Sequence, residues 1–407
     1  MAELTAPTQR VRIDNIDILR GIVMVVMALD HVRDFFHKTY VEGGADLATG
    51  PTDLDHTTPL LFFTRWITHF CAPIFVFLAG TSAYLLGLKK SKNELSIFLI
   101  KRGLWLVVVE LLIITLGWTF NPLYNVFILQ VIWAIGWSLV ILGLLVHLPY
   151  RVIFLVGAII VFGHNLLDYP AINSSLKGSV VGDLLYFSQF AFYKVFSGHF
   201  VLIVYAVIPW TGLMALGYCF GKLYQPGFDP VRRKKLLIVT GTALLLLFIV
   251  LRLINQYGDP VPWSPHPRGT IFSFLSFINV NKYPPSLDFL LVTIGVCLLA
   301  LALLQNVRNR VTIFFRVFGR VPMFYYILHF YLIHLLVVIG FFQQGFPASK
   351  IISPDVPFLF RPAEYGYGLG VVYLIWLTVV VLLYPLCKKY DRYKTANAGR
   401  KWWLSYL

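Results

Sequence analysis

The chain has 407 residues, of which 58% are hydrophobic and only 13% are charged, and its mean hydropathy is +0.74. This composition excludes a soluble globular protein. The net charge of +15 suggests a nucleic-acid-binding protein, but the basic residues are distributed along the chain in the pattern of a membrane protein, which excludes that class.

Apolar runs long enough to cross a bilayer, roughly 20 residues each, recur along the whole chain. The sequence therefore predicts an all-α, polytopic bundle of about 10 to 11 transmembrane helices. A further segment, 181–196, is predicted to be an interfacial or partly buried helix. The predicted transmembrane helices span residues 16–37, 59–88, 96–118, 125–148, 152–167, 199–221, 236–255, 286–306, 321–343 and 365–386.

The basic residues alternate between the two sides of this predicted bundle. With the N-terminus in the cytoplasm, 23 lysines and arginines fall in cytoplasmic segments and 7 in the opposite loops. The positive-inside rule then predicts that both termini are cytoplasmic. The segment before the first apolar run is polar and too long for a cleavable signal peptide, so the first helix is predicted to be a signal anchor. We expect a multi-pass protein of a bacterial inner membrane.

No internal repeat or low-complexity linker divides the sequence, which predicts one membrane domain over residues 10–390. Most of the candidate catalytic motifs lie in 10–225, and residues 391–407 are predicted to form a basic cytoplasmic tail. Function concentrates in loops held by a rigid scaffold, so the longer outer loops indicate the functional side. Those outer segments are 38–58, 168–198 and 256–285.

Ionisable residues inside the apolar segments are the strongest functional signal, because a charge in hydrocarbon is costly. Asp30 and His31 lie near the outer end of the first helix, roughly 20 Å above its start at 1.5 Å per residue. His69 lies at a matching depth on the second helix, and Arg65 lies one turn from it on the same face. We expect Asp30, His31 and His69 to converge.

Further candidates have plain structural alternatives. His334 and Arg252 lie near outer helix ends and could bind substrate or only contact lipid headgroups. Asp17 and Arg20 form an i, i+3 pair at the cytoplasmic start of the first helix and could bind a cofactor or only stabilise the helix end. His329 is interpreted as a hydrogen-bonded structural histidine that points away from His334.

Histidine is the usual general base near neutral pH, and a neighbouring carboxylate can orient it. Arginine can hold a phosphate or an oxyanion. These residue types fit acyl transfer from a thioester to a hydroxyl or an amine, although they do not select it. Two histidines and an aspartate could also bind zinc, but neither HxxxH nor HExxH occurs on one helix, so we expect no metal.

Several motifs together resemble one family. The segments RIDNIDILRGIVMVVMALDH, TRWITHFCAPIFVFLAGTSAYLL, IPWTGLMALGY, NKYPPSLDFLL and GRVPMFYYILHFYLIHLL are similar to those of bacterial proteins related to heparan-alpha-glucosaminide N-acetyltransferase. The resemblance implies that an acetyl group passes from cytosolic acetyl-CoA to a sugar or an amino sugar on the far side of the membrane. It also implies a catalytic histidine in the first outer loop, where this chain has His37 and His56.

We therefore expect His31 or His69 to act as the base, with His56 in reserve, Asp30 as the orienting group and Arg65 on the acceptor or oxyanion. Asp17 and Arg20 are expected to flank the entry of coenzyme A. The partners are then the bilayer, acetyl-CoA and a glycan acceptor; self-association is left open.

The main alternative is a secondary transporter for a sugar or an organic acid, in which buried ionisable residues couple protons. A non-catalytic membrane scaffold is the third possible function.

Overall fold

The computed structural model describes residues 13–38, 52–173, 176–353, 357–397 and 400–405. Five stretches of these residues are long and apolar enough to cross a membrane: Pro59–Gly87, Tyr150–Asp168, Pro230–Ile254, Pro322–Gln343 and Leu369–Ala396. Two shorter apolar helices, Val131–Leu145 and Leu287–Leu303, join them. The chain is an all-α polytopic membrane protein, as predicted from its composition. The total number of spans and the side of each terminus stay predictions.

The helices are α1 (Asp14–Phe36), α2 (Pro59–Trp66), α3 (Cys71–Gly87), α4 (Lys92–Val109), α5 (Thr115–Thr119), α6 (Val131–Leu145), α7 (Tyr150–Gly163), α8 (Pro170–Asn173), α9 (Val180–Leu185), α10 (Ile208–Phe220), α11 (Pro230–Ile254), α12 (Thr270–Ile278), α13 (Leu287–Leu303), α14 (Arg310–Arg320), α15 (Pro322–Gln343) and α16 (Leu369–Ala396). Short helical turns are η3 (Ile67–Phe70), η4 (Glu110–Ile114), η5 (His164–Asp168), η6 (Gly221–Tyr224), η7 (Ala348–Lys350) and η8 (Trp402–Ser405).

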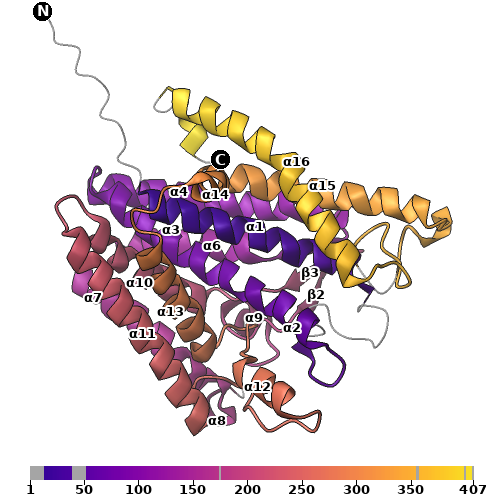
Figure 1. The fold of residues 1–407 in the computed structure, drawn as a ribbon, viewed down its shortest axis with the longest axis horizontal. Coiled ribbons are helices and arrows are strands. Elements are labelled where there is room, and N and C mark those ends of the chain that lie inside the picture. Colours follow the sequence, from indigo (N-terminus) through magenta and orange to yellow (C-terminus); the bar gives the residue numbers. More distant parts are fainter. Residues whose placement is uncertain (1–12, 39–51, 174–175, 354–356, 398–399, 406–407) are drawn as a thin grey trace, which may run out of the picture.

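Helix α1 lies inside the bundle. It packs against α14, α15 and α16 on one side and against α3 and α13 on others, and Figure 1 shows it crossing the middle of the molecule. Its contact with α14 is made through glycines: a Cβ on Gly21 would lie 1.8 Å from the carbonyl oxygen of Phe315, and one on Gly319 would lie 1.8 Å from that of Asp17. Small residues allow membrane helices to approach this closely.

Three short strands correct the sequence prediction. Val126–Leu129 forms β1, Ala191–Phe196 forms β2 and His199–Ile203 forms β3, in the order β1-β3-β2. β1 pairs with β3 in parallel, Val126 opposite Phe200, and β2 pairs with β3 antiparallel. The helices predicted to begin at 125 and 199 therefore begin at Val131 and Ile208, and the helix predicted over 181–196 ends at Leu185. Short runs of β-branched and aromatic residues suit a strand as well as a helix, and periodicity alone does not separate the two.

Two predicted long helices are interrupted. The helix predicted over 59–88 contains η3, the turn that carries His69, between α2 and α3. The helix predicted over 96–118 contains η4, a π-helical turn that begins at Glu110. Such π-turns occur often at functional sites. Helix α16 continues to Ala396, into the region 391–407 that is predicted to be the tail.

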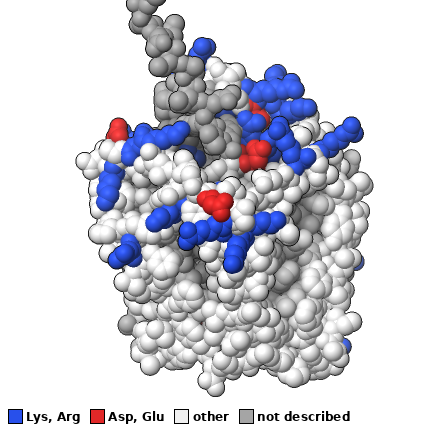
Figure 2. Space-filling view, turned by 60° about the vertical axis from the view of Figure 1, so that its left-hand side comes forward, with Lys and Arg blue, Asp and Glu red and all other residues white. Residues whose placement is uncertain are grey.

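Figure 2 shows lysines and arginines gathered at one end of the visible surface, whereas the rest of that face is almost free of charge. An uncharged flank beside a basic end is the surface expected of a protein that is embedded in a membrane with its basic loops in the cytoplasm.

Candidate active site

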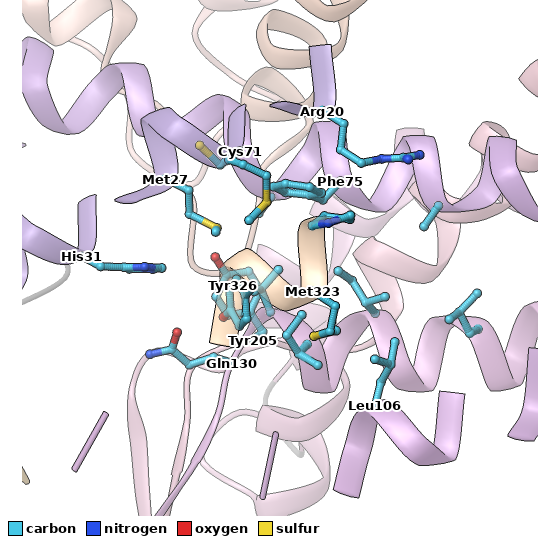
Figure 3. Close-up of a pocket in the computed structure, with 18 of the residues that line it drawn as sticks. Arg20, Met27, His31, Cys71, Phe75, Leu106, Gln130, Tyr205, Met323 and Tyr326 are labelled. Carbon is cyan, nitrogen blue, oxygen red and sulfur yellow. The ribbon is translucent and has the colours of Figure 1, made fainter. Parts of the chain in front are cut away.

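One cavity of about 950 Å³ connects regions of very different chemistry. Apolar and aromatic side chains also line it, including Met27, Phe75, Leu106, Met323 and Tyr326. Figure 3 shows Met27, Phe75 and Tyr326 between Arg20 and His31. A volume of this size is typical of a site for a small-molecule substrate. Cations line one end, which we call the basic end: Arg20, Lys90, Arg102, Arg320, Lys394, Arg400 and Lys401.

The other end, which we call the Asp30 end, is lined by Asp30, His31, Asp34, Arg65, Lys282 and Tyr283. The cavity runs along α1 from its basic end to its Asp30 end, because Arg20 and His31 both lie on that helix and both line the cavity. Eleven residues separate them, which corresponds to about 16 Å along the helix axis. The cavity is therefore long enough to join two chemically distinct sites.

Asp30 is the centre of a buried ion-pair cluster. Its carboxylate oxygens lie 2.6 Å from Nη1 of Arg65, 3.0 Å from Nη1 of Arg33 and 4.0 Å from Nζ of Lys282. The hydroxyl of Thr68 lies 2.8 Å from Oδ1. A buried charge persists only when it is paired and hydrogen-bonded. The cluster therefore accounts for Asp30 inside an apolar helix.

Lys282 and Tyr283 come from the loop between α12 and α13. The ammonium of Lys282 lies over the Tyr283 ring, 5.2 Å from its centroid, and Arg65 Nη2 lies 3.4 Å from the Tyr283 hydroxyl. Both residues belong to the motif NKYPPSLDFLL. The ammonium of Lys282 and the guanidinium of Arg65 place positive charge at the Asp30 end of the cavity.

His31 lies one residue beyond Asp30 but has a different partner. Its Nδ1 lies 2.7 Å from Nε2 of His329 on α15. The ring packs against Phe330 and Trp118, with centroids at 4.2 and 5.3 Å. Figure 3 shows the imidazole extending into the cavity. A buried imidazole that lines a cavity is a candidate general base.

The structure places His69 away from this lining. His69 is 4% exposed and its ring lies 5.6 Å from that of Phe289, with no hydrogen-bond partner for Nδ1 among the described residues. Arg65, its predicted neighbour, turns instead toward Asp30. The structure therefore joins Asp30, Arg65 and His31 around the cavity and leaves His69 beside it.

The other candidates lie at separate places. Arg252 donates to four backbone carbonyls, those of Phe277, Val261, Ser276 and Asn279, so it binds the segment between α11 and α13 to α11. The ring nitrogens of His334 lie 3.1 Å from the Gly117 carbonyl oxygen and 2.9 Å from that of Leu359. Both side chains are buried and neither lines the cavity, so they contact the main chain and not lipid headgroups.

His56 lies just before α2, with its side chain 72% exposed and Nδ1 2.6 Å from Oδ2 of Asp53. This hydrogen bond raises the pKa of His56 above its usual value. At the basic end, Arg20 lies 3.4 Å from Asp17 and donates to Ser82 over 3.1 Å. Of this pair, Arg20 lines the cavity.

Sequence analysis did not select His329, Lys282 or Arg33 as site residues. His329 resembled many structural membrane histidines, and Lys282 was assigned to an outer loop. Their motifs were the available signal, since GRVPMFYYILHFYLIHLL and NKYPPSLDFLL carry His329 and Lys282. Within the part of the chain that the structure describes, no group of three or more His, Cys, Asp or Glu side chains is placed to hold a metal.

Residues 12–252 match the family described as heparan-alpha-glucosaminide N-acetyltransferase, catalytic. The chain belongs to this family. The match includes both the Asp30–Arg65 pair and His31. It identifies the protein as a membrane acetyltransferase, and the cavity that connects a basic end with a buried imidazole is its candidate active site. No curated protein matches the chain.

Proposed function

We propose that the protein transfers the acetyl group of cytosolic acetyl-CoA to the hydroxyl or the amine of a sugar or amino sugar on the opposite side of the membrane. The observation that carries this proposal is the single cavity that joins the basic end to His31. Coenzyme A carries phosphates on a long, flexible thiol-terminated arm. Its phosphates fit a cluster of lysines and arginines, and its arm fits the apolar middle of the cavity.

The basic end is proposed to face the cytoplasm, where acetyl-CoA is made. Support comes from the distribution of basic residues along the sequence and over the surface in Figure 2. The Asp30 end then faces the outer loops, from which the acceptor enters. In a bacterial cell with an inner membrane this side is the periplasm.

In the proposed reaction, Nε2 of His31 accepts a proton from the acceptor as its oxygen or nitrogen attacks the thioester carbonyl carbon. The carbonyl oxygen becomes an oxyanion, and Arg65 and Lys282 stabilise that charge in a site where water does not screen it. The C–S bond then breaks, and the sulfur of coenzyme A leaves with the proton from His31. Asp30 holds the two cations in place through its ion pairs.

The decisive experiment incubates purified protein with radiolabelled acetyl-CoA and a panel of amino sugars and neutral envelope glycans. We expect a labelled product whose formation falls at least about 100-fold in His31→Ala. His56→Ala is the matched control, since His56 lies outside the cavity lining and should retain wild-type rates. Sugar uptake into proteoliposomes without acetyl transfer would establish the transporter instead, and full activity of His31→Ala would overturn the role of His31.

The binding of coenzyme A is tested separately. Arg20→Gln is expected to raise the KM for acetyl-CoA by about tenfold, the effect of losing one charge-assisted contact. Lys350→Gln is the control, because Lys350 is exposed, pairs with Glu364 and does not line the cavity. Equal KM values in the two variants would contradict a coenzyme A site at the basic end. Acetylated protein formed in the absence of acceptor would show that the acetyl group passes through a covalent intermediate.

A further inference from the structure

His31 and His329 form a buried pair that joins α1 to α15. Nδ1 of His31 lies 2.7 Å from Nε2 of His329, whose own Nδ1 lies 3.1 Å from the Tyr325 carbonyl oxygen one turn earlier on α15. His329 is 0% exposed. We propose that His329 is a positioning residue, which fixes His31 in the tautomer whose Nε2 is unprotonated and faces the cavity. This inference rests on the proposed function.

The position of each proton follows from the acceptors. A backbone carbonyl only accepts hydrogen bonds, so Nδ1 of His329 must carry a proton to bond the Tyr325 oxygen. A neutral imidazole carries one N–H, which leaves Nε2 of His329 as an acceptor. The proton between the two rings must then belong to Nδ1 of His31. Nε2 of His31 is left with its lone pair.

The surroundings favour two neutral rings. The rings of Tyr325 and Phe330 lie 5.3 and 4.5 Å from that of His329, so an imidazolium there would be a buried charge. The carboxylate of Asp30 beside His31 is already paired with three cations of the cluster, so it does not compensate a positive charge on the ring. A neutral pair linked to the Tyr325 carbonyl is the arrangement that satisfies both hydrogen bonds.

This tautomer is the one that the proposed chemistry needs. His31 lines the cavity, and within the described residues we find no hydrogen-bond partner for its Nε2. In a histidine side chain free in water the proton prefers Nε2, and an Nε2 that carries a proton cannot accept one from the acceptor. An acceptor at Nδ1 reverses that preference, as outer partners do for histidines that bind metals or act in catalysis.

The orienting group is therefore His329 rather than Asp30. The sequence assigns orientation to Asp30 because the two residues are adjacent. In the structure, however, the oxygens of Asp30 are held by Arg65, Arg33 and Thr68. Adjacent residues on a helix point about 100° apart, so the carboxylate and the imidazole bind different neighbours.

Two variants, one with and one without a hydrogen-bond acceptor, test this role by kinetics. In His329→Gln, the amide oxygen can replace Nε2 as the acceptor, whereas His329→Phe keeps a ring but offers no acceptor. We expect His329→Phe to lower kcat at least about tenfold, with the KM for acetyl-CoA within about twofold of wild type, and His329→Gln to restore most of kcat. A wild-type kcat in His329→Phe would overturn the proposal. Equal losses in both variants would do so too, because they indicate packing alone.

A spectroscopic measurement tests the tautomer without any assay. The chain has 10 histidines, so the ¹⁵N signals of His31 are assigned in labelled protein in lipid nanodiscs by their loss in His31→Ala. In the wild type we expect a protonated Nδ1 and an unprotonated Nε2, and in His329→Phe a protonated Nε2. A protonated Nε2 in the wild type would overturn the inference even if acetyl transfer is confirmed. Absence of acetyl transfer would instead refute the proposed function and leave the tautomer to this measurement.

Discussion

Arg65 donates to Asp30 over 2.6 Å and thereby joins α2 to α1 at the end of the cavity. Both side chains are buried, at 3% and 8% exposure. Arg33 and Lys282 also pair with the same carboxylate. Asp30 is therefore the shared partner of cations that come from three different parts of the chain.

Asp30→Asn should destabilise the fold strongly, because it leaves Arg65, Arg33 and Lys282 buried around a neutral amide. Removing one partner of a buried ion pair costs about 3–5 kcal/mol. Thermal unfolding in detergent measures the loss. Asp34→Asn is the control, since Asp34 is less buried than Asp30 and pairs with Arg33. A destabilisation by Asp30→Asn no larger than that of Asp34→Asn would contradict a central role for Asp30.

Gly319→Ala should destabilise the contact of α14 with α1. The new Cβ would lie 1.8 Å from the Asp17 carbonyl oxygen, and backbone cannot move aside without shifting a helix. We expect a loss of about 1–3 kcal/mol, as for overpacked cores. Gly370 in α16 is the control, because a Cβ added there has no neighbouring atom within 4 Å. The unfolding temperature of Gly370→Ala should equal or slightly exceed that of the wild type. Equal midpoints for both variants would refute the close contact.

Glu110 connects the π-helical turn to the start of α6. Its Oε1 accepts from the Gln130 backbone N–H over 3.2 Å, and the residue is 0% exposed. Glu110→Leu removes the acceptor and should cost about 1–3 kcal/mol. Glu110→Gln keeps an oxygen at that position and should cost less than about 1 kcal/mol. Denaturation curves of the two variants decide the point, and a Leu variant as stable as the Gln variant would exclude this role.

The hydrogen bond between His56 and Asp53 should make the stability of the fold depend on pH. Because the folded pKa of His56 is raised above its unfolded value of about 6.5, the pair stabilises the fold fully below that value. The contribution is lost as pH rises through the folded pKa. Histidine NMR titration should show the raised value in the wild type and a lower one in Asp53→Asn. An unchanged pKa of His56 in Asp53→Asn would show that the hydrogen bond does not raise that pKa.

Much of the site was accessible from the sequence because the reason for it is local. The cost of charge in hydrocarbon marks Asp30, His31 and Arg65 whatever their partners are. The pairing of Arg65 with Asp30 was not predicted, because the sequence analysis assigned Arg65 to the acceptor or the oxyanion. The prediction for His69 lacked such a constraint, because a neutral histidine does not require an opposite charge.

The strands show where local patterns were insufficient. Val126–Leu129 and His199–Ile203 are apolar segments continuous with helices, and their pairing joins residues more than seventy positions apart. Ile128 and Leu202 from these strands line the cavity. The wall of the candidate site is therefore built by a contact that hydropathy does not encode.

The sequence by itself determined the membrane-embedded helical class, the family and the residues whose charge needs a partner, because each of these depends on composition or on neighbours along one helix. The tertiary structure alone decided which partners they find. His31 meets His329 across 298 positions only because α1 and α15 pack side by side. A hydrogen bond depends on tenths of an ångström, and only the packing of helices sets such distances.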